Sequence, residues 1–475
     1  MLVLALEAST SAAKAMVLDS EKGIVRSGQT AYPDSFGNEG CLNAVSILEC
    51  TLALGRKTAQ GCAIEAVAIC GIWHSLAVFD GTFHPVTPLY MWNFLGTSGI
   101  CSDIRHNDEL TEQIYRSTGC MPHCTYPRHA LQLLKQQGFD LTDKKIMTEG
   151  AYLFLQLTGE WMESASTQSG SGLIHLKTKG YDPLILDMLG IQEKQLGTLG
   201  NYRDTRPLSK SGAEKLGLSA GIPVVPAHPD GALNQIGNYA SAPGIMTLSV
   251  GTSAALRLTV REPELPKNRG LWCYCGADDW ILGAATAGAC SCINWFRDKM
   301  AGGMSFENLE KGRMHQPDLP VFLPFVFGER CPGWRDDRSG IFCRIKPWHG
   351  VEDFYTSVQT GVLFNLYQCY RILAETEKAP EKIIVSGGIT NSKRWEQMLA
   401  DIFGREIFIS DYSNASTVGA GALALLAAGA IRSLSDFHMG MDRLRTVEPD
   451  RSAAGFYEEE YQTYLNYYST VFAEA

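Results

Sequence analysis

One aspartate follows a predicted strand in a position suited to acid–base chemistry. The apolar segment 223–227 ends in a turn that contains Asp230 and Gly231 and leads into a helix. A carboxylate at the end of a strand can accept the proton of a hydroxyl group while that oxygen attacks a phosphoryl group. Asp230 is therefore the predicted general base. The alternative is that Asp230 only caps the helix that starts at Ala232.

A short run of small, hydroxyl-bearing residues occurs twice in the chain, about half its length apart. The two copies are Ser9 to Ala13 and Gly251 to Ala255, and each lies between apolar stretches. Each copy therefore predicts a β-hairpin with Ser and Thr at its tip. Backbone N–H groups and hydroxyls at such tips can surround an anion, and two facing tips can hold a polyphosphate. A tight turn would explain a single copy, but the repeat favours phosphate binding and predicts two related domains.

A glycine pair follows another apolar strand in the second half. The strand 382–385 runs into Gly387 and Gly388 and then into a helix. A turn without side chains lets a flat or anionic ligand approach the backbone at the carboxyl end of the strand. A plain strand-to-helix turn is an equally good interpretation. Because the chain contains neither a G-x-x-x-x-G-K-[ST] P-loop nor a G-x-G-x-x-G motif, any phosphate site must use turns of these kinds.

Two aromatic segments have a composition suited to a sugar-like ligand. Trp73 and His74 follow one strand-like run, and Trp92 and Asn93 follow another. Indole faces beside hydrogen-bonding groups match ligands with apolar faces and polar rims. The alternative is that these side chains fill the core. The charged loop 328–338 also has two interpretations, a salt-bridged surface loop or part of a site.

The elements that must position these residues alternate between strands and helices in both halves of the chain. In the first half the pattern predicts a hairpin ending at residue 19, strands at 25–30, 67–70 and 223–227, and helices at 41–60, 108–117, 130–137 and 148–158. In the second half it predicts strands within 245–260 and at 280–284 and 382–385, and helices at 290–300, 351–376, 393–403 and 417–426. This alternation predicts an α/β fold. With a boundary near 239–243, we expect an N-terminal domain (1–241), a C-terminal domain (242–475) and a cleft between them.

Length and composition agree with a globular protein of two domains. The 475 residues are 45% hydrophobic and 19% charged, with a net charge of −10. This acidity argues against a nucleic-acid groove or an anionic membrane surface as partner. The longest weakly polar run, 418–431, is too short to span a bilayer, and the run 1–6 lacks the basic start of an export signal. We therefore expect a cytoplasmic protein with neither a membrane nor a nucleic acid as partner.

The 14 cysteines are scattered along the chain, as expected for reduced thiols. Two C-x-C pairs, Cys273 with Cys275 and Cys290 with Cys292, offer four thiolates, and a zinc site is one interpretation. The favoured interpretation is that these cysteines are small core residues.

Taken in order, these segments resemble the FGGY family of carbohydrate kinases from Leu4 to about Gly429. The resemblance covers two phosphate hairpins (6–14 and 250–253), sugar segments (71–75 and 92–93), the base motif (230–231), a G-E-R-x-P loop (328–332) and an adenosine segment (386–404). It implies two RNase H-like (actin-type ATPase) domains with MgATP bound between them. It also implies ATP-dependent phosphorylation of a sugar or polyol hydroxyl.

The resemblance also implies roles for individual residues. Asp230 would be the catalytic base, would contact the acceptor and, with Glu7, would hold Mg²⁺ through waters. ATP would be bound by Ser9, Thr10, Ser11, Lys14, Gly251, Thr252, Ser253, Trp295, Gly387, Gly388 and Asn391. The acceptor would be bound by Trp73, His74, Trp92, Asn93 and Tyr126.

The stretch 271–295, together with residues 73–75, looks most like the gluconate-kinase branch. A gluconate-like sugar acid is therefore the favoured acceptor, and xylulose or another ketose or polyol is the alternative. The partner implied is a small sugar or sugar acid, and the resemblance allows a homodimer.

Several positions depart from the family pattern. Glu7 and Ser9 stand where the first hairpin usually has Asp and Gly, and the W-x-D-x-R sugar motif reads W-N-F-L-G at 92–96. Loss of that acid and guanidinium motivates a different kind of function, a nucleotide-binding sensor of the same fold with weakened catalysis. A glycosidase with Asp230 and Asp401 as its carboxylate pair is disfavoured, because no segment brings the two acids together.

Overall fold

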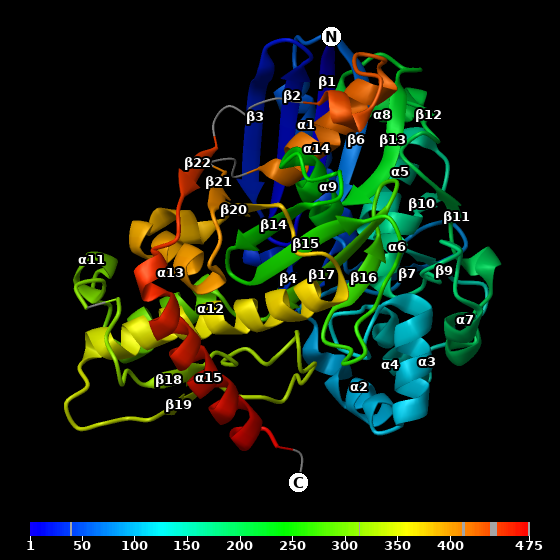
Figure 1. The fold of residues 1–475 in the computed structure, drawn as a ribbon. Helices are drawn as coiled ribbons and strands as arrows, with labels where there is room; N and C mark the ends of the chain where they lie inside the picture. Colours follow the sequence, from blue (N-terminus) through cyan, green and yellow to red (C-terminus); the bar gives the residue numbers. More distant parts are fainter. Residues whose placement is uncertain (39, 313, 411–413, 438–443, 474–475) are drawn as a thin grey trace.

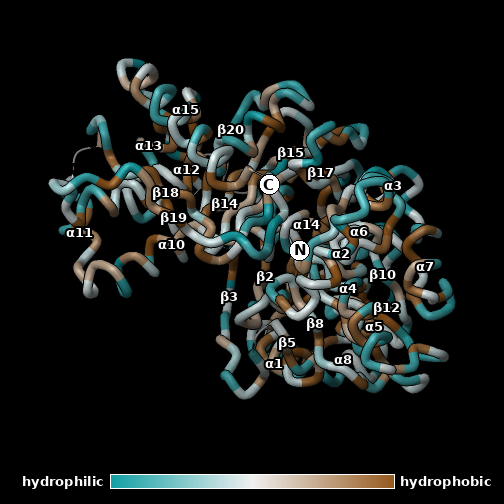
Figure 2. Tube along the Cα trace, turned by 90° about the horizontal axis from the view of Figure 1, so that it is seen from below, coloured by the Kyte–Doolittle hydropathy of each residue, from teal (hydrophilic) through white to brown (hydrophobic). Residues whose placement is uncertain are grey.

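The fold is built on two large β-sheets, each at the centre of its own lobe (Figure 1). The computed structural model describes residues 1–38, 40–312, 314–410, 414–437 and 444–473. Hydrophilic segments lie mostly on the outside of the trace (Figure 2). The α/β class expected from the alternation of elements is confirmed.

The first sheet has the strand order β12, β13, β6, β1, β2, β3. β1 pairs in parallel with β6, and β6 in parallel with β13, while β2 and β3 add as antiparallel neighbours of β1. The strands are β1 (Leu2–Ala8), β2 (Ala12–Asp19), β3 (Gly23–Ala31), β6 (Ile64–Gly71), β12 (Arg206–Pro207) and β13 (Pro223–Pro229).

Helices cover both faces of the first sheet, which is why β1 reads as a continuous apolar run and not as an alternating one. These helices are α1 (Ala44–Ala59), α5 (Glu149–Thr158), α9 (Asp230–Gly237) and α14 (Ala415–Ala427). Leu4 of β1 packs with α1 and α5, and its neighbour Val3 packs with α9 and α14 on the other face. α14 belongs to the second half of the sequence, yet it packs against β1, β6 and α9 (Figure 1).

The second sheet has the order β16, β17, β15, β14, β20, β21, β22. Its strands are β14 (Ile245–Val250), β15 (Ala254–Val260), β16 (Trp272–Cys275), β17 (Trp280–Thr286), β20 (Lys382–Ser386), β21 (Ile407–Ile409) and β22 (Arg445–Val447). Its helices include α10 (Cys290–Trp295), α12 (Val351–Thr376), α13 (Lys393–Phe403) and α15 (Ala454–Val471). Side chains from α12, α13 and α15 share one large hydrophobic core with this sheet.

Five strands follow the same path in both sheets. The order β3, β2, β1, β6, β13 in the first matches β17, β15, β14, β20, β21 in the second, with the same parallel and antiparallel pairings. The repeated hairpins occupy the same place in each sheet, between its first two strands. The duplication predicted from the short repeated sequence is therefore present in the fold, whereas the boundary at 241/242 stays a prediction.

Smaller elements complete the two lobes. The remaining helices are α2 (Ser98–Arg105), α3 (Asp108–Thr118), α4 (Arg128–Gln136), α6 (Ala165–Ser171), α7 (Pro183–Leu189), α8 (Lys210–Leu216) and α11 (Phe306–Leu309). The remaining strands are β4 (Gly37–Asn38), β5 (Cys41–Leu42), β7 (Ser75–Phe79), β8 (Leu89–Met91), β9 (Lys145–Met147), β10 (Met162–Ser164), β11 (Thr198–Gly200), β18 (Val321–Leu323) and β19 (Ile341–Cys343). None of the helices that the structure describes has the length and apolar character needed to cross a membrane.

Candidate active site

A cavity of about 880 Å³ lies where the tips of the two repeated hairpins meet the end of β13. Predicted ATP, base and metal residues that line it are Glu7, Ser9, Thr10, Ser11, Lys14, Asp230, Gly251, Thr252, Ser253, Gly387, Gly388 and Asn391. Residues that the sequence did not single out also line it, among them Asn234, Ser249, Arg257 and Ser416. The fold thus brings the predicted phosphate turns and the predicted base to one cavity.

Glu7 ties the first hairpin to α14. Its side chain is buried on the face of β1 that packs against α14, and its Oε1 accepts a hydrogen bond of 2.8 Å from Lys14 Nζ. Its Oε2 accepts hydrogen bonds from the hydroxyls of Ser416, at 2.9 Å, and Thr417. Burial opposes protonation of Lys14, but the charge and hydrogen bond of Glu7 raise its pKa overall.

The second hairpin is held by backbone groups. Gly251 N–H donates to the Ser253 carbonyl at 2.9 Å, and the Gly251 and Thr252 carbonyls accept hydrogen bonds from backbone N–H groups at the start of α10. Gly387 approaches from β20 with a φ of +95°, and a Cβ there would lie 2.5 Å from the carbonyl oxygen of Val250. Only glycine fits this position without strain.

Asp230 is the first residue of α9, directly after β13. Its Oδ1 accepts hydrogen bonds from the backbone N–H groups of Gly231, at 2.8 Å, and Trp73, at 3.3 Å. No residue in the described part of the chain donates a hydrogen bond to its Oδ2, although the side chain lines the cavity. Burial raises the pKa of Asp230, the charge of Arg257 opposes this, and the charge of Glu7 adds to it. The carboxylate thus has one fixed oxygen and one available oxygen.

The predicted acceptor residues Trp73, His74 and Tyr126 lie behind Asp230 and outside the cavity lining. Trp73 packs against Gly231, where an added Cβ would lie 2.3 Å from the indole ring, and its Nε1 donates to the Ser166 carbonyl at 2.8 Å. His74 Nδ1 bonds to the Gly170 carbonyl at 2.5 Å. Burial, with the charges of nearby arginines, lowers the pKa of His74 to about 3, so its ring is neutral.

These three side chains join aromatic residues of the second sheet. Tyr126 and Tyr274 share a hydrogen bond of 2.8 Å between their hydroxyls, and the Trp73 ring meets the Tyr274 ring edge-on with centroids 4.9 Å apart. The cluster therefore connects the two lobes beside the cavity. The role of these residues in binding an acceptor stays a prediction.

The remaining predicted site residues lie in three different surroundings. Trp92 Nε1 donates to Thr10 Oγ1 at 3.2 Å, so it contacts the first hairpin directly. Asn93 is exposed. Trp295, at the end of α10, stacks on Phe322 with centroids 6.2 Å apart and is absent from the cavity lining.

The charged loop 328–338 joins the C-terminal lobe to the N-terminal one. Glu329 is buried and accepts hydrogen bonds from Arg338 and from Tyr468, the latter at 2.8 Å. Asp336 accepts hydrogen bonds from His123 and from the Cys124 thiol, the latter at 3.0 Å. The loop is thus anchored from both lobes, so the salt-bridged-surface interpretation is wrong for Glu329 and Asp336, whose side chains are almost fully covered.

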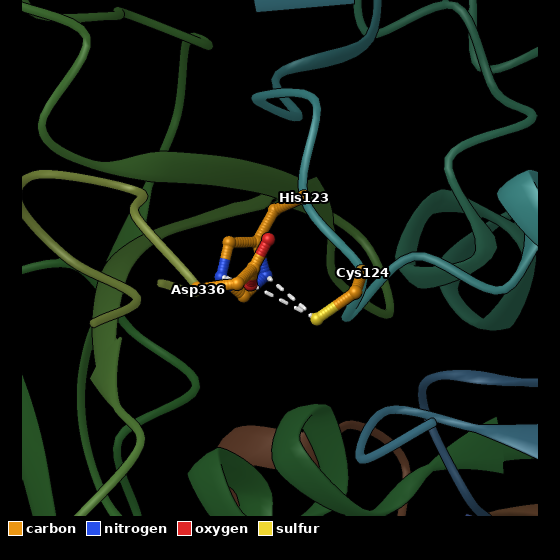
Figure 3. A group of neighbouring side chains, drawn as sticks. All are labelled: His123, Cys124 and Asp336. Atoms are coloured by element: carbon orange, nitrogen blue, oxygen red, sulfur yellow. Dashed lines mark hydrogen bonds and ion pairs between the residues drawn. The ribbon is translucent and has the colours of Figure 1, made fainter. Parts of the chain in front are cut away.

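Figure 3 shows His123, Cys124 and Asp336, whose ligand-type atoms all lie within 4.8 Å of one another. Thr125 N–H donates to His123 Nδ1 at 3.1 Å, so the Nε2 proton points at Asp336. Burial opposes ionisation of Asp336, but the hydrogen bonds from His123 and Cys124, with the charges of His123 and Arg105, lower its pKa. The hydrogen bonds among these three side chains therefore explain why they lie together.

The two C-x-C pairs do not form a metal-ligating group in the parts of the chain that the structure describes. Cys273, Cys275 and Cys292 are buried, and no disulfide joins any two described cysteines. This agrees with the favoured interpretation of the pairs as small core residues.

Arg257 is the functional candidate that the sequence interpretation missed. Its signal was present in the sequence, because it is the single charged residue in the strand A-A-L-R-L-T-V. Ser416 and Thr417 could not have been found in this way, because only the packing of α14 brings them to Glu7.

Two models of one protein family match this chain. The N-terminal domain model of the FGGY family of carbohydrate kinases matches residues 2–237, and the C-terminal domain model of the same family matches residues 246–428. Together the two models span most of the chain.

Two characterised relatives cover nearly the full chain at modest identity. Gluconokinase from Bacillus subtilis (strain 168) is 26% identical over 455 residues, which are 91% of this chain and 88% of the relative. Xylulose kinase from Escherichia coli (strain K12) is 25% identical over 417 residues, which are 85% of this chain and 84% of the relative.

Solved structures show the same fold. Gluconate kinase from Lactobacillus acidophilus superposes with a TM-score of 0.92 at 24% identity, over 100% of this chain and 98% of that one. The ligand-bound xylulose kinase from the same organism gives 0.92 at 24% identity, over 100% and 99%. The expected pair of actin-type ATPase domains is confirmed. Because the N-terminal and C-terminal domain models match in order along the chain, the chain belongs to the FGGY family of carbohydrate kinases.

Proposed function

We propose that the protein transfers the γ-phosphoryl group of ATP to a hydroxyl group of a small sugar acid, sugar or polyol, with a gluconate-like acceptor favoured. The observation that carries this proposal is the position of Asp230 at the edge of the cavity that both hairpins line. The relatives named gluconokinase support the sugar acid, and those named xylulose kinase support a ketose as the alternative.

In this proposal Asp230 is the general base. Its Oδ2 accepts the proton of the acceptor hydroxyl as that oxygen attacks the γ-phosphorus, and the bond to the bridging oxygen breaks so that ADP leaves. The amides of Gly231 and Trp73 fix Oδ1 and so orient the carboxylate. The raised pKa makes Asp230 a stronger base than an exposed aspartate.

The two hairpins hold the phosphates of ATP. Their hydroxyls and backbone N–H groups, together with the Lys14 ammonium, supply donors at the cavity wall, and Gly387, Gly388 and Asn391 form the wall where the adenosine would lie. Trp295 is proposed as a further nucleotide contact, although it stands outside the lining.

Mg²⁺ fits this site through waters. Both oxygens of Glu7 already accept hydrogen bonds from Lys14, Ser416 and Thr417, whereas Asp230 Oδ2 accepts none from any described residue. Mg²⁺ keeps several waters and binds few carboxylates beside substrate phosphates, so Asp230 and, through water, Glu7 are the residues that would hold it. When bound, the ion would neutralise charge on the transferring phosphoryl group.

Trp73, His74, Trp92, Asn93 and Tyr126 are proposed to form the acceptor side of the site. Apart from the exposed Asn93, they present aromatic faces near Asp230 and Thr10, as a ligand with apolar faces requires. The cytoplasm is the proposed location, supported by the lack of disulfides among the described cysteines. Assembly as a homodimer stays a prediction.

The test is an ADP-release assay with MgATP against gluconate, xylulose, ribulose, glycerol and erythritol. Acceptor-dependent ADP release, with gluconate giving the highest kcat/KM, is the expected result. A higher kcat/KM for xylulose would favour the ketose alternative. ATP binding without acceptor-dependent turnover would instead favour a nucleotide-binding sensor, the function suggested by the altered segment 92–96.

A further inference from the structure

Two arginines lie beside the predicted base and the buried His74. Arg257 comes from β15 and lines the cavity, and Arg330 comes from the charged loop 328–338. Burial is the main cause of the lowered pKa of His74, and the charges of both arginines add to it. Burial also lowers the pKa of Arg257, and the charge of Arg330 adds to that shift. Arg257 Nε lies close to the Trp73 ring, because a Cβ added at Gly231 would lie 3.1 Å from this nitrogen and 2.3 Å from the indole. The Arg330 guanidinium lies over the Trp92 ring. Both arginines therefore lie on the side of Asp230 where the aromatic residues lie.

Neither guanidinium forms an ion pair with an acid in the described parts of the chain. Arg330 is only 8% exposed, and its guanidinium makes no hydrogen bond or ion pair with any residue that the structure describes. Arg257 donates to Ser249 Oγ at 3.0 Å, but its buried Nε has no partner within the described ranges. An unpaired charge taken out of water is unfavourable, so two such groups together indicate a site for an anion.

Acids close to these arginines have other roles. Glu329, next to Arg330 in the chain, is bound by Arg338 and Tyr468. Asp230 is the acid whose charge acts on Arg257, and it is the predicted base. By contrast, Arg344 elsewhere in this lobe is paired with Glu460 at 2.5 Å. Among these acids only Asp230 acts on Arg257 and none pairs with Arg330, so the arginines can accept further negative charge from a ligand.

The position of Arg330 favours the acceptor over the nucleotide as the source of that charge. Arg330 is absent from the lining of the cavity between the hairpins, and its guanidinium lies over the Trp92 ring, 5.9 Å from the ring centre. A planar guanidinium presents a fork of N–H donors that matches a carboxylate, and two such groups can bind both of its oxygens.

The loop holds Arg330 in place before any ligand binds. Cys331 N–H donates to the Ala285 carbonyl at 3.0 Å, and Asn365 Nδ2 donates to the Cys331 carbonyl at 3.3 Å. On the other side, the Glu329 carboxylate is fixed by its hydrogen bonds to Arg338 and Tyr468. These bonds fix the chain on both sides of Arg330, so little backbone freedom remains to be lost when its side chain binds a ligand.

We propose that Arg257 and Arg330 bind the carboxylate of the acceptor, so that the enzyme selects sugar acids over neutral polyols of the same length. This proposal rests on the proposed function of the same site and names the residues that set its specificity.

The first test measures binding, which does not depend on turnover. Gluconate and glucitol are titrated calorimetrically into the wild type and into Arg330→Gln and Arg257→Gln. Gluconate has a carboxylate at the position where glucitol has a hydroxymethyl group. We expect the wild type to bind gluconate roughly 10- to 100-fold more tightly than glucitol, as expected for hydrogen bonds to a charged group. Each variant should remove most of that preference and leave glucitol binding within about threefold.

Arg335→Gln is the matched control, because it removes the same charge from the same loop. Its side chain is 37% exposed and pairs with Asp337 at the surface, so the preference for gluconate should not change. Arg330→Lys, which keeps the charge but loses the fork, should keep part of the preference. Thermal unfolding of each variant verifies that it is folded.

Three results would overturn the proposal. The wild type could bind gluconate and glucitol equally, or both variants could weaken the two ligands equally. The variants could also raise the KM for ATP and leave the gluconate preference intact, which would assign the arginines to the nucleotide phosphates. Absence of turnover with every acceptor would instead refute the proposed function, and the binding comparison would still decide the role of the arginines.

Discussion

The first hairpin and the second hairpin have nearly the same tip sequence but are held in different ways. In the first, Glu7 pairs with Lys14 across the two strands, and Glu7 is tied to α14. In the second, the residues in the corresponding pair are Ser249 and Ala255, and the tip is fixed by backbone hydrogen bonds to the start of α10. The comparison teaches that a duplicated hairpin can place an ion pair across its strands in one copy and an uncharged pair, with a backbone-held tip, in the other.

Among changes to the two hairpins, the largest expected effect comes from the charged pair of the first hairpin. Glu7→Gln removes the partner of Lys14 and weakens the acceptor for Ser416 and Thr417. We expect kcat to fall roughly 10- to 100-fold, because the Lys14 ammonium is no longer held beside the phosphates and Mg²⁺ loses a water-mediated carboxylate. The matched change in the second hairpin, Ser249→Ala, should alter kcat less than about threefold. Equal losses in the two variants would show that the hairpins share the charge-dependent role.

The backbone requirement should be strict for one glycine and mild for another. Gly387 has a φ of +95° and packs against Val250, whereas a Cβ at Gly251 would have no atom nearer than the Ser253 carbonyl oxygen at 3.8 Å. Gly387→Ala should therefore raise the KM for ATP by roughly 10-fold through strain, and Gly251→Ala should raise it less than about twofold. Steady-state kinetics with varied ATP measures both. A larger effect at Gly251 would contradict the cradle described here.

Two buried carboxylates, one in each lobe, have different surroundings. Glu149 beneath the first sheet is buried, which raises its pKa to about 8, and the charge of Glu163 adds to this. In the second lobe, buried Glu396 accepts a hydrogen bond of 2.6 Å from Arg445. The folded state thus binds the Glu149 proton more tightly than the unfolded chain does, so this group makes stability fall as pH rises from about 4.5 to about 8.

Glu149→Gln should reduce that fall in the free energy of unfolding by roughly 2 kcal/mol or more, since each pKa unit is worth about 1.4 kcal/mol. Urea unfolding at pH 5 and pH 8.5 measures it. Glu396→Gln, which leaves Arg445 without its charged partner, should lower stability at both pH values instead. If Glu149→Gln leaves the pH slope unchanged, the carboxyl is ionised throughout.

The smallest effect concerns the tie between Trp92 and the first hairpin. Trp92→Phe removes the hydrogen bond from Nε1 to Thr10 Oγ1, and a single neutral hydrogen bond contributes about 1 kcal/mol. We expect a two- to fivefold rise in the KM for ATP. Ser291→Ala removes a comparable tie of the second hairpin, from Ser291 Oγ to the Thr252 carbonyl. A similar rise there would show that side-chain ties matter equally in both hairpins.

Features that local sequence encodes were predicted well. The helices α12 and α13 have the predicted bounds 351–376 and 393–403, because their apolar periodicity is flanked by clear stop signals such as Gly404. The predicted helix 41–60 starts at residue 44 instead, because Asn43 caps it and residues 41–42 pair as β5. The predicted helix 290–300 is α-helical to Trp295 and then continues as a π-helical turn.

Features that depend on distant contacts were not predicted. Glu7 meets Thr417, 410 positions away, only because α14 returns to the first sheet. Asp230 is the first residue of α9 and its carboxylate is bound by the amide of Trp73 as well as that of Gly231, so simple capping of a helix at Ala232 does not describe it. Local pattern carries no information on such pairings, whereas the repeated hairpin sequence did carry information on the duplication.

In the proposed mechanism, Asp230 accepts the proton of an acceptor hydroxyl while the hairpins hold ATP. The most direct measurement compares gluconate-dependent ADP release and ATP binding in the wild type and in Asp230→Asn. If Asp230 is the base, kcat in Asp230→Asn falls roughly 10²- to 10⁴-fold, while the Kd for ATP changes less than about threefold. Turnover that is unchanged in Asp230→Asn would contradict it.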